Sequence, residues 1–279
     1  MNTLKLSAFA DEAGEDFALQ LSALRRNGFG YMEIRSVEHQ NVSKITPDKA
    51  KELRKRMDDA GIACRVIGSP VGKIAIDRAA EHEEVLRRVA DVAHILGADK
   101  VRMFSYFMQP YETEQCESRV VEALCRLQEI AKAQNLMLCH ENEKGIFGYN
   151  AENCLKLMRQ VPGLRAVFDP ANFVQCRVNT LYAWHLLKEH VEYLHAKDAK
   201  TDGKVVACGA GAGFVPVIVE EFLKRGGDMI TLEPHLFSFS ALKTLEENPE
   251  ARSEFALADE AFDTAAAALK KIIGEGENV

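Results

Sequence analysis

Four short segments in the second half of the chain carry side chains that can bind a metal ion. They are HEN (140–142), FDPANF (168–173), LHAKD (194–198) and LEPH (232–235), and each follows or ends a run of β-type residues. Carboxylates and imidazoles are ligands for hard or borderline divalent cations such as Mn²⁺, Mg²⁺, Co²⁺ and Zn²⁺. Three carboxylates and one imidazole, one from each segment, would suit a single ion of this kind.

Strand alternation indicates which side chains in these segments can share a face. Glu141 shares a face with Cys139, and His195 shares one with Lys197, because successive side chains of a strand point to opposite faces. Glu143 has the same parity as Glu141 and remains an alternative ligand. His140 has the opposite parity, so we expect it to point away from the site toward the helices.

The elements that must position these residues alternate along the whole chain. Short β-type runs are separated by amphipathic stretches, a pattern that predicts parallel strands with crossover helices. The expected strands are 4–10, 31–35, 63–69, 100–106, 136–142, 164–170, 191–198 and 229–235. The expected helices are 17–27, 47–60, 78–96, 114–134, 150–160, 179–190, 216–226 and 255–273, the last after a polar insertion at 245–252.

Eight such units favour an α/β protein of the (β/α)8 type, a TIM barrel, formed by one domain over residues 1–279. A doubly wound open sheet also alternates strand and helix, but no Gly-x-Gly-x-x-Gly follows the first strand, where the acidic ADEAGED stands instead. In a (β/α)8 barrel the active site lies where strands end and the following loops begin. The four segments above would therefore meet at one mouth.

Bulk composition is that of a soluble globular protein, with 47% hydrophobic and 28% charged residues. The formal net charge of -7 disfavours a nucleic-acid partner held through its phosphates. We expect no membrane association, because no run approaches the about 18 apolar residues of a membrane span. Seven scattered cysteines without a Cys-x-x-Cys pair indicate reduced thiols and a cytoplasmic location.

The four segments, taken in order, resemble the xylose isomerase-like barrels, the sugar phosphate isomerase/epimerase superfamily that also includes AP endonucleases. Each motif is weak alone, but four in order at the spacing of βα units are specific, and the resemblance covers essentially the whole chain. It implies that Glu141, Asp169, His195 and Glu233 bind one divalent metal ion (Mn, Mg, Co or Zn). The trinuclear zinc site of the AP endonucleases is not expected, because Asn172 stands where they have a second histidine.

The resemblance further implies a metal-dependent isomerase or epimerase in which Glu141 and Glu233 move the substrate proton. A metal chelated by a carbonyl and the adjacent hydroxyl acidifies the C–H bond between them, and a nearby carboxylate can take that proton and return it. The expected substrate is a small keto-sugar or a related carbohydrate-like hydroxy-ketone. The same resemblance is compatible with a homo-oligomer.

Four further residues are candidates for substrate binding. Lys197 shares a face with His195 and either holds substrate oxygens or pairs with a metal-binding carboxylate. Arg102, inside a predicted strand, needs a carboxylate partner in a barrel interior, and a Glu33–Arg102 pair would satisfy both. Lys73, in the loop SPVGKI, either reaches an anionic group of the substrate or is a solvated loop lysine, and Asn172 is also expected at the pocket.

Two other functions remain open. The same metal and base pair could eliminate water from an inosose- or dehydroshikimate-like β-hydroxy ketone, which would make the protein a dehydratase. A barrel that binds a metabolite without turnover is the alternative from a different class. The glycine-rich CGAGAGF (208–214) either cradles a phosphate or forms a tight turn before the next helix.

Overall fold

The computed structural model of the chain describes residues 3–237 and 255–274. The polar insertion expected at 245–252 lies outside the described residues. Within the described ranges, no helix is both long enough and apolar enough to cross a membrane.

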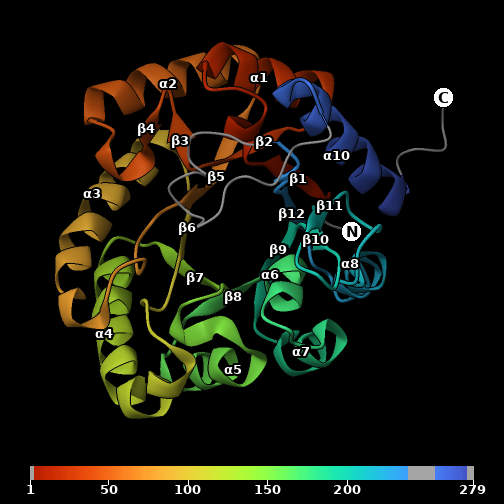
Figure 1. Cartoon of the computed structure of the whole chain (residues 1–279). Helices are drawn as coiled ribbons and strands as arrows, with labels where there is room; N and C mark the ends of the chain where they lie inside the picture. Colours follow the sequence, from red (N-terminus) through yellow and green to blue (C-terminus); the bar gives the residue numbers. More distant parts are fainter. Residues whose placement is uncertain (1–2, 238–254, 275–279) are drawn as a thin grey trace.

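A closed barrel of eight parallel strands occupies the centre of the molecule (Figure 1). Every strand expected from the sequence is present within its expected range, which confirms the predicted α/β barrel. Around the barrel the order is β1-β12-β9-β8-β7-β6-β5-β2, so the first strand pairs with the last. The strands are β1 (Lys5–Ala8), β2 (Tyr31–Ile34), β5 (Ala63–Gly68), β6 (Lys100–Met103), β7 (Met137–Glu141), β8 (Arg165–Phe168), β9 (Val191–Ala196) and β12 (Met229–Leu232).

Helices surround the barrel, and local signals fix where several of them begin and end (Figure 1). In α2 (Pro47–Ala60) the Thr46 side chain accepts a hydrogen bond from the backbone N–H of Lys49, and Gly61 ends the helix with a φ of 70°. The last helix lies beside the first, where Arg26 pairs with Asp263. The main helices are α1 (Phe17–Arg26), α2 (Pro47–Ala60), α3 (Glu81–Leu96), α4 (Thr113–Ala133), α5 (Ala151–Gln160), α7 (Thr180–Leu187), α8 (Val215–Lys224) and α10 (Ala258–Ile272).

The loops contain elements that the sequence pattern did not predict. A short helix, α6 (Pro170–Gln175), follows β8 directly. Two small hairpins are formed by β3 (Ser36–Val37) with β4 (Gln40–Asn41), and by β10 (Asp198–Ala199) with β11 (Val205–Val206). The helix expected from residue 78 begins at Glu81, because Ile76–Arg78 forms a 3-10 turn instead.

An apolar layer fills the barrel beneath its mouth. Val66, Cys139, Val167, Tyr193 and Met229 form one buried cluster from five strands. Three of these residues, Cys139, Val167 and Tyr193, lie two positions before candidate metal ligands, as expected for side chains on the same strand face. The candidate site therefore lies directly above a buried apolar layer that excludes water.

Candidate metal centre

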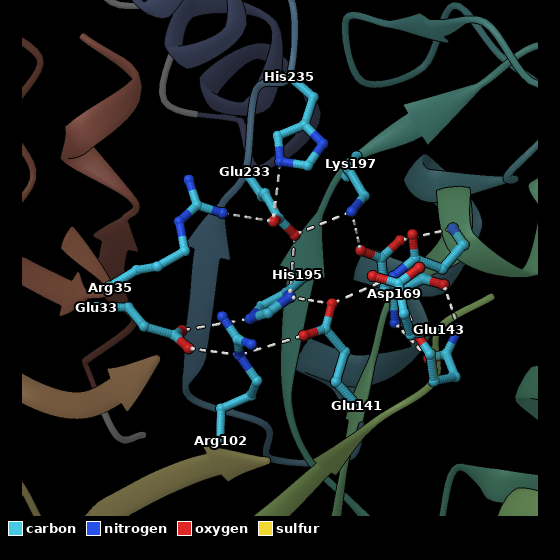
Figure 2. A network of polar contacts seen from close by, with 12 residues as sticks. Glu33, Arg35, Arg102, Glu141, Glu143, Asp169, His195, Lys197, Glu233 and His235 are labelled. Carbon is cyan, nitrogen blue, oxygen red and sulfur yellow. Dashed lines mark hydrogen bonds and ion pairs between the residues drawn. The ribbon is translucent and has the colours of Figure 1, made fainter. Parts of the chain in front are cut away.

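Glu141, Asp169, His195 and Glu233 converge at the carboxyl ends of four neighbouring strands (Figure 2). Glu141 ends β7, Asp169 directly follows β8, His195 lies in β9, and Glu233 directly follows β12. One candidate ligand atom from each lies within 4.8 Å of the others, and all four side chains are buried. The geometry therefore brings together the four residues expected from the sequence.

Asp169 is positioned by the short helix that it caps. Its Oδ1 accepts a hydrogen bond from the backbone N–H of Asn172 at 2.9 Å, which leaves Oδ2 directed toward Lys197 at 2.8 Å. The side chain of Asn142 bridges β7 to this turn, since it donates to the carbonyl and accepts from the N–H of Asp169. The Asn172 amide also donates to Glu141 Oε1 at 3.2 Å. Asn172 therefore lies in the site, against one of the candidate ligands.

His195 lies between the two glutamates. Its Nδ1 is 3.1 Å from Glu141 Oε1 and 3.3 Å from Glu233 Oε2. The other ring nitrogen, Nε2, faces Glu33 (Figure 2). Nδ1 is therefore the nitrogen available to a metal ion.

Two expected cations contact the carboxylates of the quartet. Lys197 Nζ lies 2.8 Å from Asp169 Oδ2 and 3.1 Å from Glu233 Oε2, so the ion pair considered from the sequence is present. Arg102 Nε lies 3.2 Å from Glu141 Oε2 but 3.9 Å from Glu33 Oε1. The Glu33–Arg102 pair exists, but the closer partner of Arg102 is a candidate metal ligand.

A buried ion cluster around Arg35 was not predicted. Its guanidinium group donates to both carboxylate oxygens of Asp11 at 3.0 Å, to Glu12 at 3.1 Å and to Glu233 at 3.1 Å. His235 Nε2 lies 3.2 Å from the same Glu233 oxygen. The available sequence signal was the place of Arg35 directly after a strand, at the level where polar residues face the mouth.

A pocket opens above these residues. Glu141 and Glu233 line it, whereas Asp169 and His195 have no exposed surface. Each of the four residues proposed for substrate binding also lines the pocket. They are Lys73, Arg102, Asn172 and Lys197.

Burial and neighbouring charges act in opposite directions on the carboxylates. Burial alone would raise the pKa of Glu141, but the charges of His195 and Arg102 outweigh it and lower that pKa to about 2. Burial likewise opposes the low pKa of Glu233, which the charge of Lys197 holds well below the usual range. In Asp169 burial dominates and, with repulsion from Glu233, raises the pKa to about 7 despite Lys197. The positive groups already present therefore keep Glu141 and Glu233 ionised, whereas Asp169 has too little positive charge beside it to offset its burial.

Two neighbouring features have other partners. Glu143, the alternative ligand, pairs with Lys73 at 3.3 Å, and Lys73 lies over the ring of Phe104 at 4.3 Å. In the glycine-rich segment, the backbone N–H groups of residues 209, 211 and 213 donate to the buried carboxylate of Asp198. These amides form a tight turn around Asp198 and are not directed at a phosphate.

The donor set of the quartet fits one divalent ion. Octahedral donors about 2.1 Å from an ion lie at most about 4.2 Å apart, so ligand atoms within 4.8 Å need to move only slightly. Three carboxylates and one imidazole suit Mn²⁺, Mg²⁺, Co²⁺ or Zn²⁺. We therefore treat the four residues as a candidate metal centre.

The model of the family described as xylose isomerase-like TIM barrel matches residues 21–261. No functionally curated protein matches the chain. Among solved structures, the chain is similar to a probable 3-DHS dehydratase, AsbF, from Bacillus anthracis, with 14% identity over 96% of this chain and 98% of that one and a TM-score of 0.74.

Two other solved structures are similar in fold. The IOLI protein, which was solved with a zinc atom, is 17% identical, and the match covers 99% of this chain and 100% of that one with a TM-score of 0.74. An L-ribulose 3-epimerase is 19% identical, and the match covers 99% of this chain and 97% of that one with a TM-score of 0.73. At these identities the likeness establishes the shared barrel.

Proposed function

The chain belongs to the xylose isomerase-like TIM barrel family, and on that premise we propose that it is a divalent-metal-dependent isomerase or epimerase. Its proposed substrate is a small keto-sugar or a related hydroxy-ketone. The proposal rests chiefly on one observation: of the four buried candidate ligands, Glu141 and Glu233 line the pocket from two different strand ends.

When bound, the metal ion polarises a carbonyl and the adjacent hydroxyl, which acidifies the C–H bond between them. Glu141 or Glu233 takes that proton, and the same or the other carboxylate returns it to a neighbouring carbon or to the opposite face. Both glutamates are held as carboxylates by nearby positive charge, which is the ionisation state that a proton acceptor requires. The net result is an isomer or an epimer of equal mass.

The cations beside these glutamates stabilise the enediolate that forms. Arg102 and Lys197 line the pocket, and each contacts one of the two glutamates. Negative charge that develops on a substrate oxygen would lie within reach of these donors in a water-poor site. Lys73 and Asn172 provide additional polar contacts for substrate hydroxyls.

A dehydratase is the second candidate, since the fold is shared with a probable 3-DHS dehydratase. Elimination requires an acid at the leaving hydroxyl. His235 lines the pocket and contacts Glu233 at 3.2 Å, so an acid of suitable chemistry stands beside one proposed base. The product would then be one water lighter than the substrate.

The test is solvent deuterium uptake by keto-sugars and inososes with the Mn²⁺-, Co²⁺- or Mg²⁺-loaded protein, read by mass spectrometry. We expect a product of substrate mass plus incorporated deuterium, with uptake lost in Glu141→Gln and Glu233→Gln. A product lighter by one water establishes the dehydratase instead. Metal loading with no uptake and no product across the panel would contradict both enzymes and favour a non-catalytic binding protein.

A further inference from the structure

Glu33 is a buried carboxylate on β2, a strand outside the four that carry the candidate ligands. Its Oε2 lies 3.3 Å from His195 Nε2 (Figure 2). In the barrel order β2 is separated from β9 by β1 and β12, so Glu33 reaches His195 across the interior. A buried charged group requires a polar partner, and the partner of Glu33 is His195, a candidate metal ligand.

The two nitrogens of His195 face different groups. Nδ1 faces the oxygens of Glu141 and Glu233, where the ion would bind, and Nε2 faces Glu33. A metal-binding nitrogen must present its lone pair, so the ring proton must reside on Nε2 and be donated to Glu33. A carboxylate at this position therefore selects the tautomer that leaves Nδ1 free for the metal.

Glu33 is itself held in place. The Tyr193 hydroxyl donates to its Oε1 at 3.0 Å, and Arg102 lies 3.9 Å from the same oxygen. The pairing of β2 with β5 shifts register between Met32 and Glu33, an irregularity of the kind that redirects a side chain. Phe9 packs edge-on against the His195 ring at 5.2 Å and limits its rotation. The contact is thus fixed from both ends.

We infer that Glu33 is a positioning residue that orients His195 and sets its tautomer for metal binding, with Tyr193 holding Glu33 in turn. This inference rests on the proposed metal centre and goes beyond its four ligands. Outer carboxylates of this kind change metal affinity without touching the metal. Glu33 therefore acts through His195 and not on the substrate.

The experiment measures Co²⁺ affinity by chelator competition and records the visible absorption of the Co²⁺-loaded protein. We expect Glu33→Ala to weaken Co²⁺ binding about 10- to 100-fold and to change the absorption bands. Glu33→Gln keeps an acceptor oxygen but removes the charge, so it should weaken Co²⁺ binding less than Glu33→Ala does. Tyr193→Phe removes only the support of Glu33 and should weaken Co²⁺ binding less than about tenfold.

Glu117→Gln is the matched control, because Glu117 lies on α4 and pairs with the exposed Lys156. It should bind Co²⁺ as the wild type does. If the wild type binds no metal, the proposed function fails and this inference fails with it. If the wild type binds Co²⁺, while folded Glu33 variants and Tyr193→Phe match its affinity and spectrum, only this inference is overturned. If Glu33→Ala does not fold, Glu33→Gln and Tyr193→Phe decide.

Discussion

The two halves of the barrel mouth carry different kinds of residue. The strands β7, β8, β9 and β12 end in the four candidate ligands, three of which are acidic. On the other side of the ring, β2 carries Glu33 and is followed directly by Arg35, and β6 carries Arg102. The first half carries the candidate ligands, and residues of the second half contact three of them.

The contacts across the mouth are specific. The two glutamates proposed to move protons are each reached by an arginine, Glu233 by Arg35 at 3.1 Å and Glu141 by Arg102 at 3.2 Å. His195 is reached by Glu33. A set of candidate metal ligands therefore describes only part of this centre, since residues of the opposite wall contact Glu141, His195 and Glu233. Asp169 is instead contacted by Lys197 and Asn172 from the ligand half.

The strongest challenge to the ligand half is Glu141→Gln. We expect turnover to fall about 10³-fold, because the change removes a candidate metal ligand and a proposed base together. The measurement is the rate of solvent deuterium uptake at saturating substrate. Glu143→Gln is the matched control two residues away, and it should keep both metal and most turnover, since Glu143 pairs with Lys73. A loss in Glu143→Gln with Glu141→Gln unaffected would show that the wrong glutamate has been assigned, and equal losses would contradict the distinction between them.

In the opposite half, Arg35→Met tests whether the buried ion cluster around Arg35 stabilises the fold. It leaves Asp11 and Glu12 buried without their guanidinium partner, so the free energy of unfolding should fall by about 3 kcal/mol. Urea unfolding followed by circular dichroism measures this. Arg26→Met removes an exposed arginine paired with Asp263 and should cost less than about 1 kcal/mol. Similar losses in both variants would contradict the distinction between the buried cluster and an ordinary surface pair.

Lys73→Met examines the rim of the pocket. Lys73 is paired with Glu143 and packed over Phe104, so we expect KM to rise less than about tenfold while kcat is unchanged. Steady-state kinetics on the identified substrate separate the two constants. Lys51→Met, on the exposed face of α2, should change neither. A large fall in kcat would instead place Lys73 in the chemistry.

The smallest expected effect concerns the loop that carries Lys73. His82 Nδ1 accepts a hydrogen bond from the backbone N–H of Gly72 at 2.8 Å, and burial lowers the pKa of His82. A histidine whose pKa is lower in the folded state contributes stability above the unfolded pKa of about 6.5, and that contribution is lost as the pH falls. Between pH 7 and pH 5 we expect a loss on the order of 1 kcal/mol from this bond. His82→Asn keeps an acceptor that does not titrate, so its stability should decline less than that of the wild type.

The barrel could be predicted from the sequence because its strands are short apolar runs with clear helical stretches between them. The α6 helix was missed, since PANFVQ has only six residues and its start depends on Asp169 as a cap. The small hairpins were missed because two-residue strands leave no periodic pattern. Local sequence carries little information about such short elements.

The ligand half of the site was also accessible from sequence, because its polar residues interrupt strand ends in a recognisable order. The Arg35 cluster was not, since Arg35 and Glu233 are 198 positions apart and meet only when β1 pairs with both β2 and β12. The closer partner of Arg102 depends on how strands are staggered around the barrel, which alternation along one strand does not reveal. Long-range pairing therefore decides which charges meet.

The central claim is that Glu141, Asp169, His195 and Glu233 bind one divalent ion. Elemental analysis of the gently purified protein, compared with His195→Ala and Glu233→Gln, tests it most directly. We expect about one equivalent of Mn, Co, Mg or Zn in the wild type and clearly less in both variants. A wild type that binds no metal even after reloading, or variants that retain the full equivalent, would contradict the account.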